Sequence, residues 1–78
     1  MDYTIAKKLD ACGLICPEPV MLLHKAIREI KTGEVLEVLA TDPSTQRDIP
    51  KFCQFLGHQL MLEEVAGDNY IFHLKKGD

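Results

Sequence analysis

A helical stripe that begins directly after Cys16-Pro17 is the sequence feature that most constrains the fold. Apolar residues recur at spacings of three and four between residues 20 and 30, which is the period of an amphipathic helix. The stripe consists of Val20, Leu23, Ile27 and Ile30. The predicted helix runs from Pro17 to Lys31, because proline suits the first helical position and Thr32-Gly33 closes the helix. One face of this helix must therefore be buried against another layer.

Four strand-like segments, 7–11, 34–41, 59–65 and 70–75, supply that layer. A second helix is predicted over 45–56, with the regular helix starting near Asp48 because Pro50 is awkward inside it. Asp42 or Ser44 can cap this helix, and Gly57 ends it. The resulting order is βαβαββ. It predicts a two-layer α/β (α+β) sandwich, with a mixed four-stranded sheet and both helices on one face.

The same periodicities predict the side chains of the core. On the second helix the apolar face consists of Ile49, Phe52, Cys53 and Leu56, and the strands add Leu36, Val38, Ala40, Tyr70, Phe72 and Leu74. Glu37 is expected to point to solvent from the uncovered face of the sheet.

The chain has 78 residues, 46% of them hydrophobic and 27% charged, which predicts one domain over residues 1–78. The net charge of −3 argues against direct nucleic-acid binding, which relies on neutralising phosphates. No run is long enough for a membrane span, and residues 1–8 contain no apolar signal core, so a cytoplasmic location is expected. Three cysteines are an odd number, which suits a reducing compartment better than a disulfide framework.

Cys16 has the features of a nucleophile. With Pro17 as the first helical residue, Cys16 is the predicted N-cap, where backbone N–H groups and the helix dipole favour a thiolate. We therefore expect its pKa to lie modestly below the free-thiol value of about 8.5, with Glu18 opposing the shift. His24 lies about 12 Å further along the helix and cannot act as its base. Such a site suits sulfur exchange better than amide hydrolysis.

The loop after the second strand, Asp42–Arg47, is predicted to lie beside Cys16. Both follow parallel strands, and in open α/β sheets sites gather beyond the carboxyl ends of such strands. Several residues are candidates for docking a partner protein because of their position at this end of the sheet. They are Leu14, Ile15, Glu18, Met21, Asp42, Arg47 and Asp48. Met21 and Leu22 lie off the helical stripe, so one of them is a candidate exposed apolar contact.

The other two cysteines have simpler interpretations. Cys53 lies on the apolar stripe of the second helix and is predicted to pack in the core. Cys12 is interpreted as a small side chain at a strand end, with a resolving-thiol role as the alternative. No metal site is expected, because Cys12 and Cys16 with a distant histidine do not supply four convergent zinc ligands.

The run 9–20, LDACGLICPEPV, resembles the TusA/SirA-like sulfur carriers. Their hallmark is an Asp, a Gly three residues on and a Cys-Pro-x-Pro three further, here Asp10, Gly13, Cys16, Pro17 and Pro19. The segment 41–53 is similar to the corresponding loop and helix of the TusA members. Two positions depart from the family pattern: Ile15 stands where many members carry a basic residue, and Cys12 is not typical.

The resemblance implies a two-layer sandwich like the C-terminal domain of a translation initiation factor. It also implies that Cys16 accepts sulfane sulfur from a cysteine desulfurase as a persulfide and passes it to a downstream relay protein, toward 2-thiolation of the wobble uridine in tRNA. Asp10, Gly13, Pro17 and Pro19 would shape the site, and the carrier would need no cofactor. Relatives serve molybdenum cofactor synthesis or dissimilatory sulfur metabolism, which are the alternative destinations.

Two other classes of function stay open. The likeness to a translation-factor fold suggests a regulatory or RNA-binding module, although a fold does not carry a function. Cys12 and Cys16 together suggest a thiol-redox protein. For a carrier that docks and leaves we expect a monomer.

Overall fold

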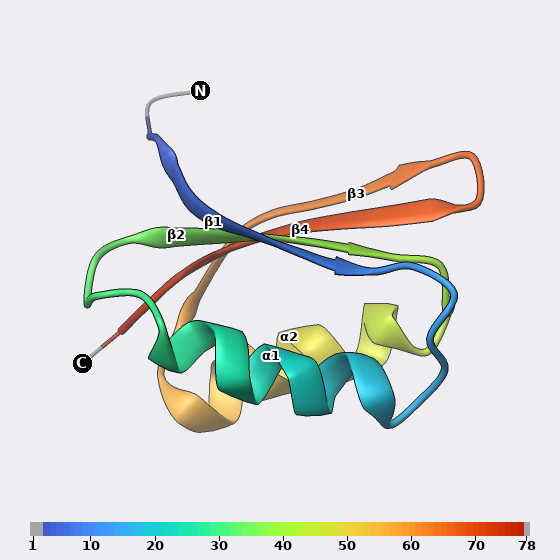
Figure 1. The fold of residues 1–78 in the computed structure, drawn as a ribbon, viewed down its shortest axis with the longest axis horizontal. Coiled ribbons are helices and arrows are strands. Elements are labelled where there is room, and N and C mark those ends of the chain that lie inside the picture. The colour runs from blue at the N-terminus through green and yellow to red at the C-terminus, as the bar shows by residue number, and fades with distance from the viewer. Residues whose placement is uncertain (1–2, 78) are drawn as a thin grey trace.

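The computed structural model describes residues 3–77, and its elements follow the predicted order. They are β1 (Ile5–Ala11), α1 (Glu18–Arg28), β2 (Val35–Ala40), α2 (Thr45–Leu56), β3 (Gln59–Ala66) and β4 (Asn69–Lys75). Both helices lie on the same face of the sheet, so the molecule has one layer of sheet and one of helices (Figure 1). Among the described residues, no helix has the length and apolar character needed to cross a bilayer.

The strands form a single mixed sheet in the order β1-β2-β4-β3. β1 and β2 run parallel, whereas β4 is antiparallel to both β2 and β3. Ala11 pairs with Ala40 at the carboxyl ends of β1 and β2. Because these two strands end at the same edge, the loops that follow them must leave the sheet side by side. The predicted fold class is confirmed.

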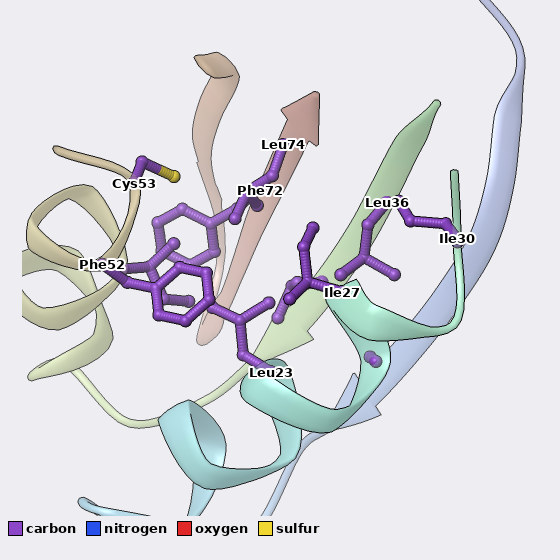
Figure 2. Close-up of a cluster of buried hydrophobic side chains, with 11 residues drawn as sticks. Leu23, Ile27, Ile30, Leu36, Phe52, Cys53, Phe72 and Leu74 are labelled. Atoms are coloured by element: carbon purple, nitrogen blue, oxygen red, sulfur yellow. The ribbon is translucent and has the colours of Figure 1, made fainter. Parts of the chain in front are cut away.

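The core fills the space between the helices and the sheet (Figure 2). It consists of Leu23, Ala26, Ile27, Ile30, Leu36, Val38, Ile49, Phe52, Cys53, Phe72 and Leu74. Most residues of the apolar stripes predicted on the two helices therefore lie in this core, and Cys53 is buried as predicted. Val20 and Tyr70 are only partly buried at the margin of the core.

One predicted core residue was wrong. Leu56 is 46% exposed, because the last turn of α2 brings it to the space between the two helices rather than to the sheet. Gly57 then ends the helix in the left-handed region, at φ 78°, as its position predicted.

The helix starts also differ from the prediction. α1 begins at Glu18 with Pro17 as its N-cap, and it ends at Arg28 rather than Lys31. α2 spans Thr45–Leu56, which is the predicted range, but it is regular from Thr45 rather than from near Asp48, in spite of Pro50. The reason is that the preceding turn satisfies its first amides: Thr45 N–H donates to the Asp42 carbonyl at 3.0 Å, and two further amides bond in the same way. Ser44 is the N-cap residue, but its side chain does not cap the helix.

A third correction concerns Glu37 on the uncovered face of the sheet. Glu37 is half-buried and its carboxylate lies 2.8 Å from Nε2 of His73, the residue directly opposite it on β4. The hydroxyl of Tyr3 lies 2.7 Å from Nδ1 of the same ring. Because an ionised carboxylate only accepts, Nε2 donates to Glu37, and the tautomer of the ring sets the direction of the bond between Nδ1 and Tyr3. His73 is 2% exposed, so these two bonds satisfy a buried ring.

Candidate functional site

The loops after β1 and β2 meet at the shared edge of the sheet, as predicted. The N–H of Gly13 donates to the hydroxyl of Thr41 at 2.8 Å, and the N–H of Cys16 donates to Oδ2 of Asp42 at 2.7 Å. These bonds join residues that are 28 and 26 positions apart in the sequence. The position of Cys16 therefore depends on the second loop as much as on its own.

Asp42 fastens the Cys16 loop. Besides the Cys16 amide, its carboxylate accepts the hydroxyl of Ser44 at 2.7 Å and the N–H of Ser44 at 3.0 Å. These donors hold the pKa of Asp42 below its ordinary value, with the Ser44 hydroxyl as the largest cause. The carboxylate is thus charged and anchored at neutral pH.

The sulfur of Cys16 has a carboxylate partner of its own. Sγ donates to Oδ2 of Asp48 at 3.3 Å, and the other oxygen of Asp48 accepts from Nε of Arg47 at 2.9 Å. The hydrogen bond to Asp48 raises the pKa of the Cys16 thiol, and partial desolvation and the negative charge of Asp48 act in the same direction. The hydroxyl of Ser44 and the guanidinium of Arg47 oppose the rise.

The expected lowering of the Cys16 pKa was therefore wrong, for two reasons. Cys16 lies one residue before the N-cap, which is Pro17. In addition, Pro17 and Pro19 have no N–H, and the N–H of Glu18 donates to the carbonyl of Ile15 at 2.9 Å. Few amides at this helix start can face the sulfur. The carboxylate of Asp48, distant in the sequence but in contact with the sulfur, therefore decides the direction of the pKa shift.

The other motif residues shape the loop. Oδ1 of Asp10 accepts the N–H of Cys12 at 3.0 Å, which turns the chain directly after β1. Gly13 follows at φ 83°, a left-handed conformation that other residues rarely adopt. Pro19 is buried at the start of α1, whereas Pro17 is exposed beside Cys16.

A groove of about 370 Å³ runs between α1 and α2, with Cys16 as one of its lining residues. Its lining consists of Cys16, Pro17, Val20, His24, Asp48, Lys51, Phe52, Phe55 and Leu56. Lys51 and Phe55 are residues of the site that were not among the predicted ones. Their spacing from Asp48, at three and seven positions along one helix, was the available signal.

The predicted docking residues lie in different parts of this region. Asp48 lines the groove, whereas Asp42 and Arg47 belong to the loop and helix start beside it. Ile15 and Met21 are 69% and 62% exposed, so Met21 rather than Leu22 is the more exposed apolar residue of α1. The remaining two differ in burial: Leu14 is half-buried and Glu18 is exposed.

The three histidines contact other partners than the sulfur of Cys16. His24 lines the groove and packs edge-on against Phe52, with ring centroids 4.8 Å apart. His58 accepts the N–H of Gly77 at 3.0 Å, and His73 bonds Tyr3 and Glu37. Within residues 3–77, no group of three or more His, Cys, Asp or Glu is arranged to hold a metal ion. All three cysteines are free, with Cys12 and Cys16 exposed.

Comparison with known proteins decides the family. The family model described as Sulfurtransferase TusA matches residues 7–76. The chain belongs to the TusA family. It is 52% identical over 75 residues to Sulfur carrier protein TusA of Pseudomonas syringae pv. syringae, covering 96% of this chain and 89% of that protein. To Sulfur carrier protein TusA of Pseudomonas entomophila it is 59% identical over 68 residues, covering 87% of this chain and 85% of that protein.

The fold comparison agrees with this family. The crystal structure of a SirA-like protein from Desulfitobacterium hafniense superposes with a TM-score of 0.78 and 26% sequence identity. The match covers 92% of this chain and 99% of that one. Membership of the TusA family gives the chain the general role of a sulfur carrier.

Proposed function

We propose that Cys16 is the sulfur-carrying residue, which receives sulfane sulfur from a cysteine desulfurase and holds it as a persulfide. The observation that carries this proposal is the position of Cys16. Its thiol is exposed in a groove, while its backbone is fixed by a hydrogen bond of 2.7 Å to Asp42. A carrier needs this combination, because the sulfur must reach into a partner's active site from a defined position.

Loading and delivery are two displacements at sulfur. In loading, the Cys16 thiolate attacks the outer sulfur of the donor's cysteine persulfide. The new S–S bond forms on Cys16, the S–S bond of the donor breaks, and the donor cysteine leaves as a thiolate. In delivery, a thiolate of a downstream relay protein attacks the outer sulfur of the Cys16 persulfide. The S–S bond on Cys16 breaks, and Cys16 leaves as a thiolate. Neither step consumes an oxidant, a reductant or a cofactor.

The surroundings of Cys16 support a carrier better than a dithiol redox protein. The Asp10 carboxylate also faces the Cys12 side chain, and its hydrogen bond with the thiol is the largest cause raising the pKa of that thiol. Cys16 interacts with Asp48. Each exposed thiol is thus stabilised in its protonated form by a different carboxylate, and no contact pairs the two sulfurs as a redox dithiol would need.

Docking would use the apolar surface around the groove. Ile15, Met21 and Phe55 are the most exposed large apolar side chains near it, with Phe55 at 79% exposure. A transient interface of modest area suits a carrier that must bind and leave, and we expect the carrier to work as a monomer in the cytoplasm. Asp42, Arg47, Glu18 and Asp48 would form the polar part of this contact.

The test is sulfur loading from a cysteine desulfurase and cysteine, followed by intact-mass measurement. We expect the wild type and Cys12→Ser to gain one sulfur atom, and Cys16→Ser to gain none while keeping its melting temperature. Loading that survives Cys16→Ser and disappears with Cys12→Ser would move the carrier site to Cys12. Loss of two hydrogens from the wild type would favour the redox alternative.

For the destination of the sulfur we propose 2-thiolation of the wobble uridine in tRNA. A strain without its own carrier should regain this modification with the wild-type chain but not with Cys16→Ser. Restored molybdenum-enzyme activity or sulfur oxidation without restored tRNA thiolation would assign the protein to one of the alternative pathways.

A further inference from the structure

We propose that Asp48 is a positioning residue that keeps Cys16 in its thiol form in the unloaded carrier, and that Arg47 sets how strongly it does so. This inference rests on the proposed carrier role of Cys16. It adds a control on the reactivity of that residue, exerted by a side chain 32 positions away in the sequence.

The contact between Asp48 and the sulfur favours one protonation state. An ionised carboxylate has only acceptor sites, so Oδ2 of Asp48 at 3.3 Å from Sγ requires a proton on the sulfur. If that proton leaves, two negative charges face each other at the same separation. Asp48 itself stays ionised, because Arg47 and the Cys16 thiol hold its pKa below the ordinary value.

Arg47 weakens this effect. Its Nε donates to Oδ1 of Asp48 at 2.9 Å, which draws part of the carboxylate's charge away from the sulfur. The two residues are adjacent in the chain and act on Cys16 in opposite directions. This opposition distinguishes the proposal from a purely structural role for the pair.

The other charged and titratable groups around Cys16 come from each neighbouring element. They are Glu18 and His24 on α1, Asp42 in the loop after β2, and Lys51 on α2. Asp42 is engaged with the backbone of Cys16 and with Ser44, so Asp48 is the carboxylate whose bond is to the sulfur itself.

A protein that gives or takes sulfur in short encounters gains from this arrangement. The unloaded thiol reacts slowly with small electrophiles and oxidants, because the thiolate is the reactive form. A partner that brings a cation against Asp48 acts in the same direction as Arg47 and allows the proton to leave to solvent before the S–S bond forms. Cys16 would then become reactive where a partner is docked.

The experiment is the rate of Cys16 alkylation by iodoacetamide against pH, measured on the full chain in a Cys12→Ser background. Asp48→Asn should lower the midpoint of the profile and speed alkylation near pH 7 by about threefold, since the gain in thiolate exceeds the loss in intrinsic nucleophilicity. Arg47→Gln should raise the midpoint and slow alkylation by about twofold. Asp68→Asn and Arg28→Gln make the same charge changes at exposed positions away from the groove and should leave the profile in place.

An unchanged or raised midpoint in Asp48→Asn would overturn the proposal, and so would a shift of both variants in the same direction. Circular dichroism and melting temperature check that each variant is folded. If Asp48→Asn is not folded, Arg47→Gln still decides, because its side chain is largely exposed and a lowered midpoint contradicts the proposal. No sulfur donor is used, so a failure here is separate from a failure of Cys16 to accept sulfur.

Discussion

Cys16 and Cys53 both have a raised thiol pKa, but the causes differ. Cys53 lies on the buried face of α2 and packs in the core, and burial raises its pKa to about 11. Cys16 is exposed at the edge of the sheet, where the hydrogen bond to Asp48 is the largest cause. Burial is a property of the whole fold and persists as long as the protein is folded. A single carboxylate contact can be changed by a partner or by one substitution, so only the Cys16 site can be regulated without unfolding.

The reactivity of the two thiols gives the largest contrast. With a pKa of about 11, roughly one Cys53 thiol in a thousand is ionised near pH 8, and the core also blocks access to it. We expect Cys53 to be alkylated at least about a hundredfold more slowly than Cys16 in the folded protein. In denaturant the two rates should converge, as measured by mass spectrometry of the peptides. Rapid native labelling of Cys53 would contradict its position in the core.

The two phenylalanines of α2 sharpen the same comparison between core and site. Both side chains border the groove, but Phe52 is buried in the core whereas Phe55 is exposed (Figure 2 shows Phe52). Phe52→Ala should lower the free energy of unfolding by about 3–5 kcal/mol, because it leaves a cavity. Phe55→Ala should change it by less than about 0.5 kcal/mol but slow sulfur loading from the desulfurase. Urea unfolding measures the stability of both variants, and the rate of sulfur loading measures their docking. Normal loading by Phe55→Ala would place the docking surface elsewhere.

Gly13 tests how far the loop depends on its conformation. Apart from Gly13 itself and its two chain neighbours, nothing lies within 4 Å of the position a Cβ would take, so Gly13→Ala meets no clash with the rest of the fold. The cost of φ 83° remains, about 1 kcal/mol in the free energy of unfolding. We expect that loss in urea unfolding, with slower sulfur loading because the turn positions Cys16. Gly67→Ala, at φ 64° in the β3–β4 turn, is the matched control and should lose stability but not loading.

The smallest expected effect is the response of the site loop to acid. The pKa of Asp42 is lowered below its ordinary 3.8 in the folded protein, so the carboxylate stabilises the fold above that value and the contribution is lost as pH falls through the folded pKa. Asp42→Asn should therefore show a smaller decrease in melting temperature between about pH 5 and pH 3 than the wild type. Asp68→Asn, in the exposed hairpin turn, should follow the wild type. Identical profiles for all three would mean that Asp42 does not fasten the loop.

Several features of the fold followed from local patterns in the sequence. The 3.6-residue stripe after Pro17 and the alternation around Phe72 predicted which faces are buried, since both patterns record contact with a single core. Gly57 marked the end of α2, because a left-handed helix end favours glycine. The Cys-Pro-x-Pro motif identified the family, which the comparisons confirmed.

The tertiary structure alone decided the electrostatics of the site and the groove. The βαβ order predicted the parallel pairing of β1 with β2, but the bond from Cys16 to Asp48 also depends on the rotation of α2 about its axis, which leaves no mark on the sequence around Cys16. The burial of His73 depends likewise on Tyr3, 70 positions away. Periodicity reports whether a residue faces a core, but it does not report which distant side chain it meets. For that reason the direction in which the Cys16 pKa is shifted could not be predicted from the sequence around Cys16.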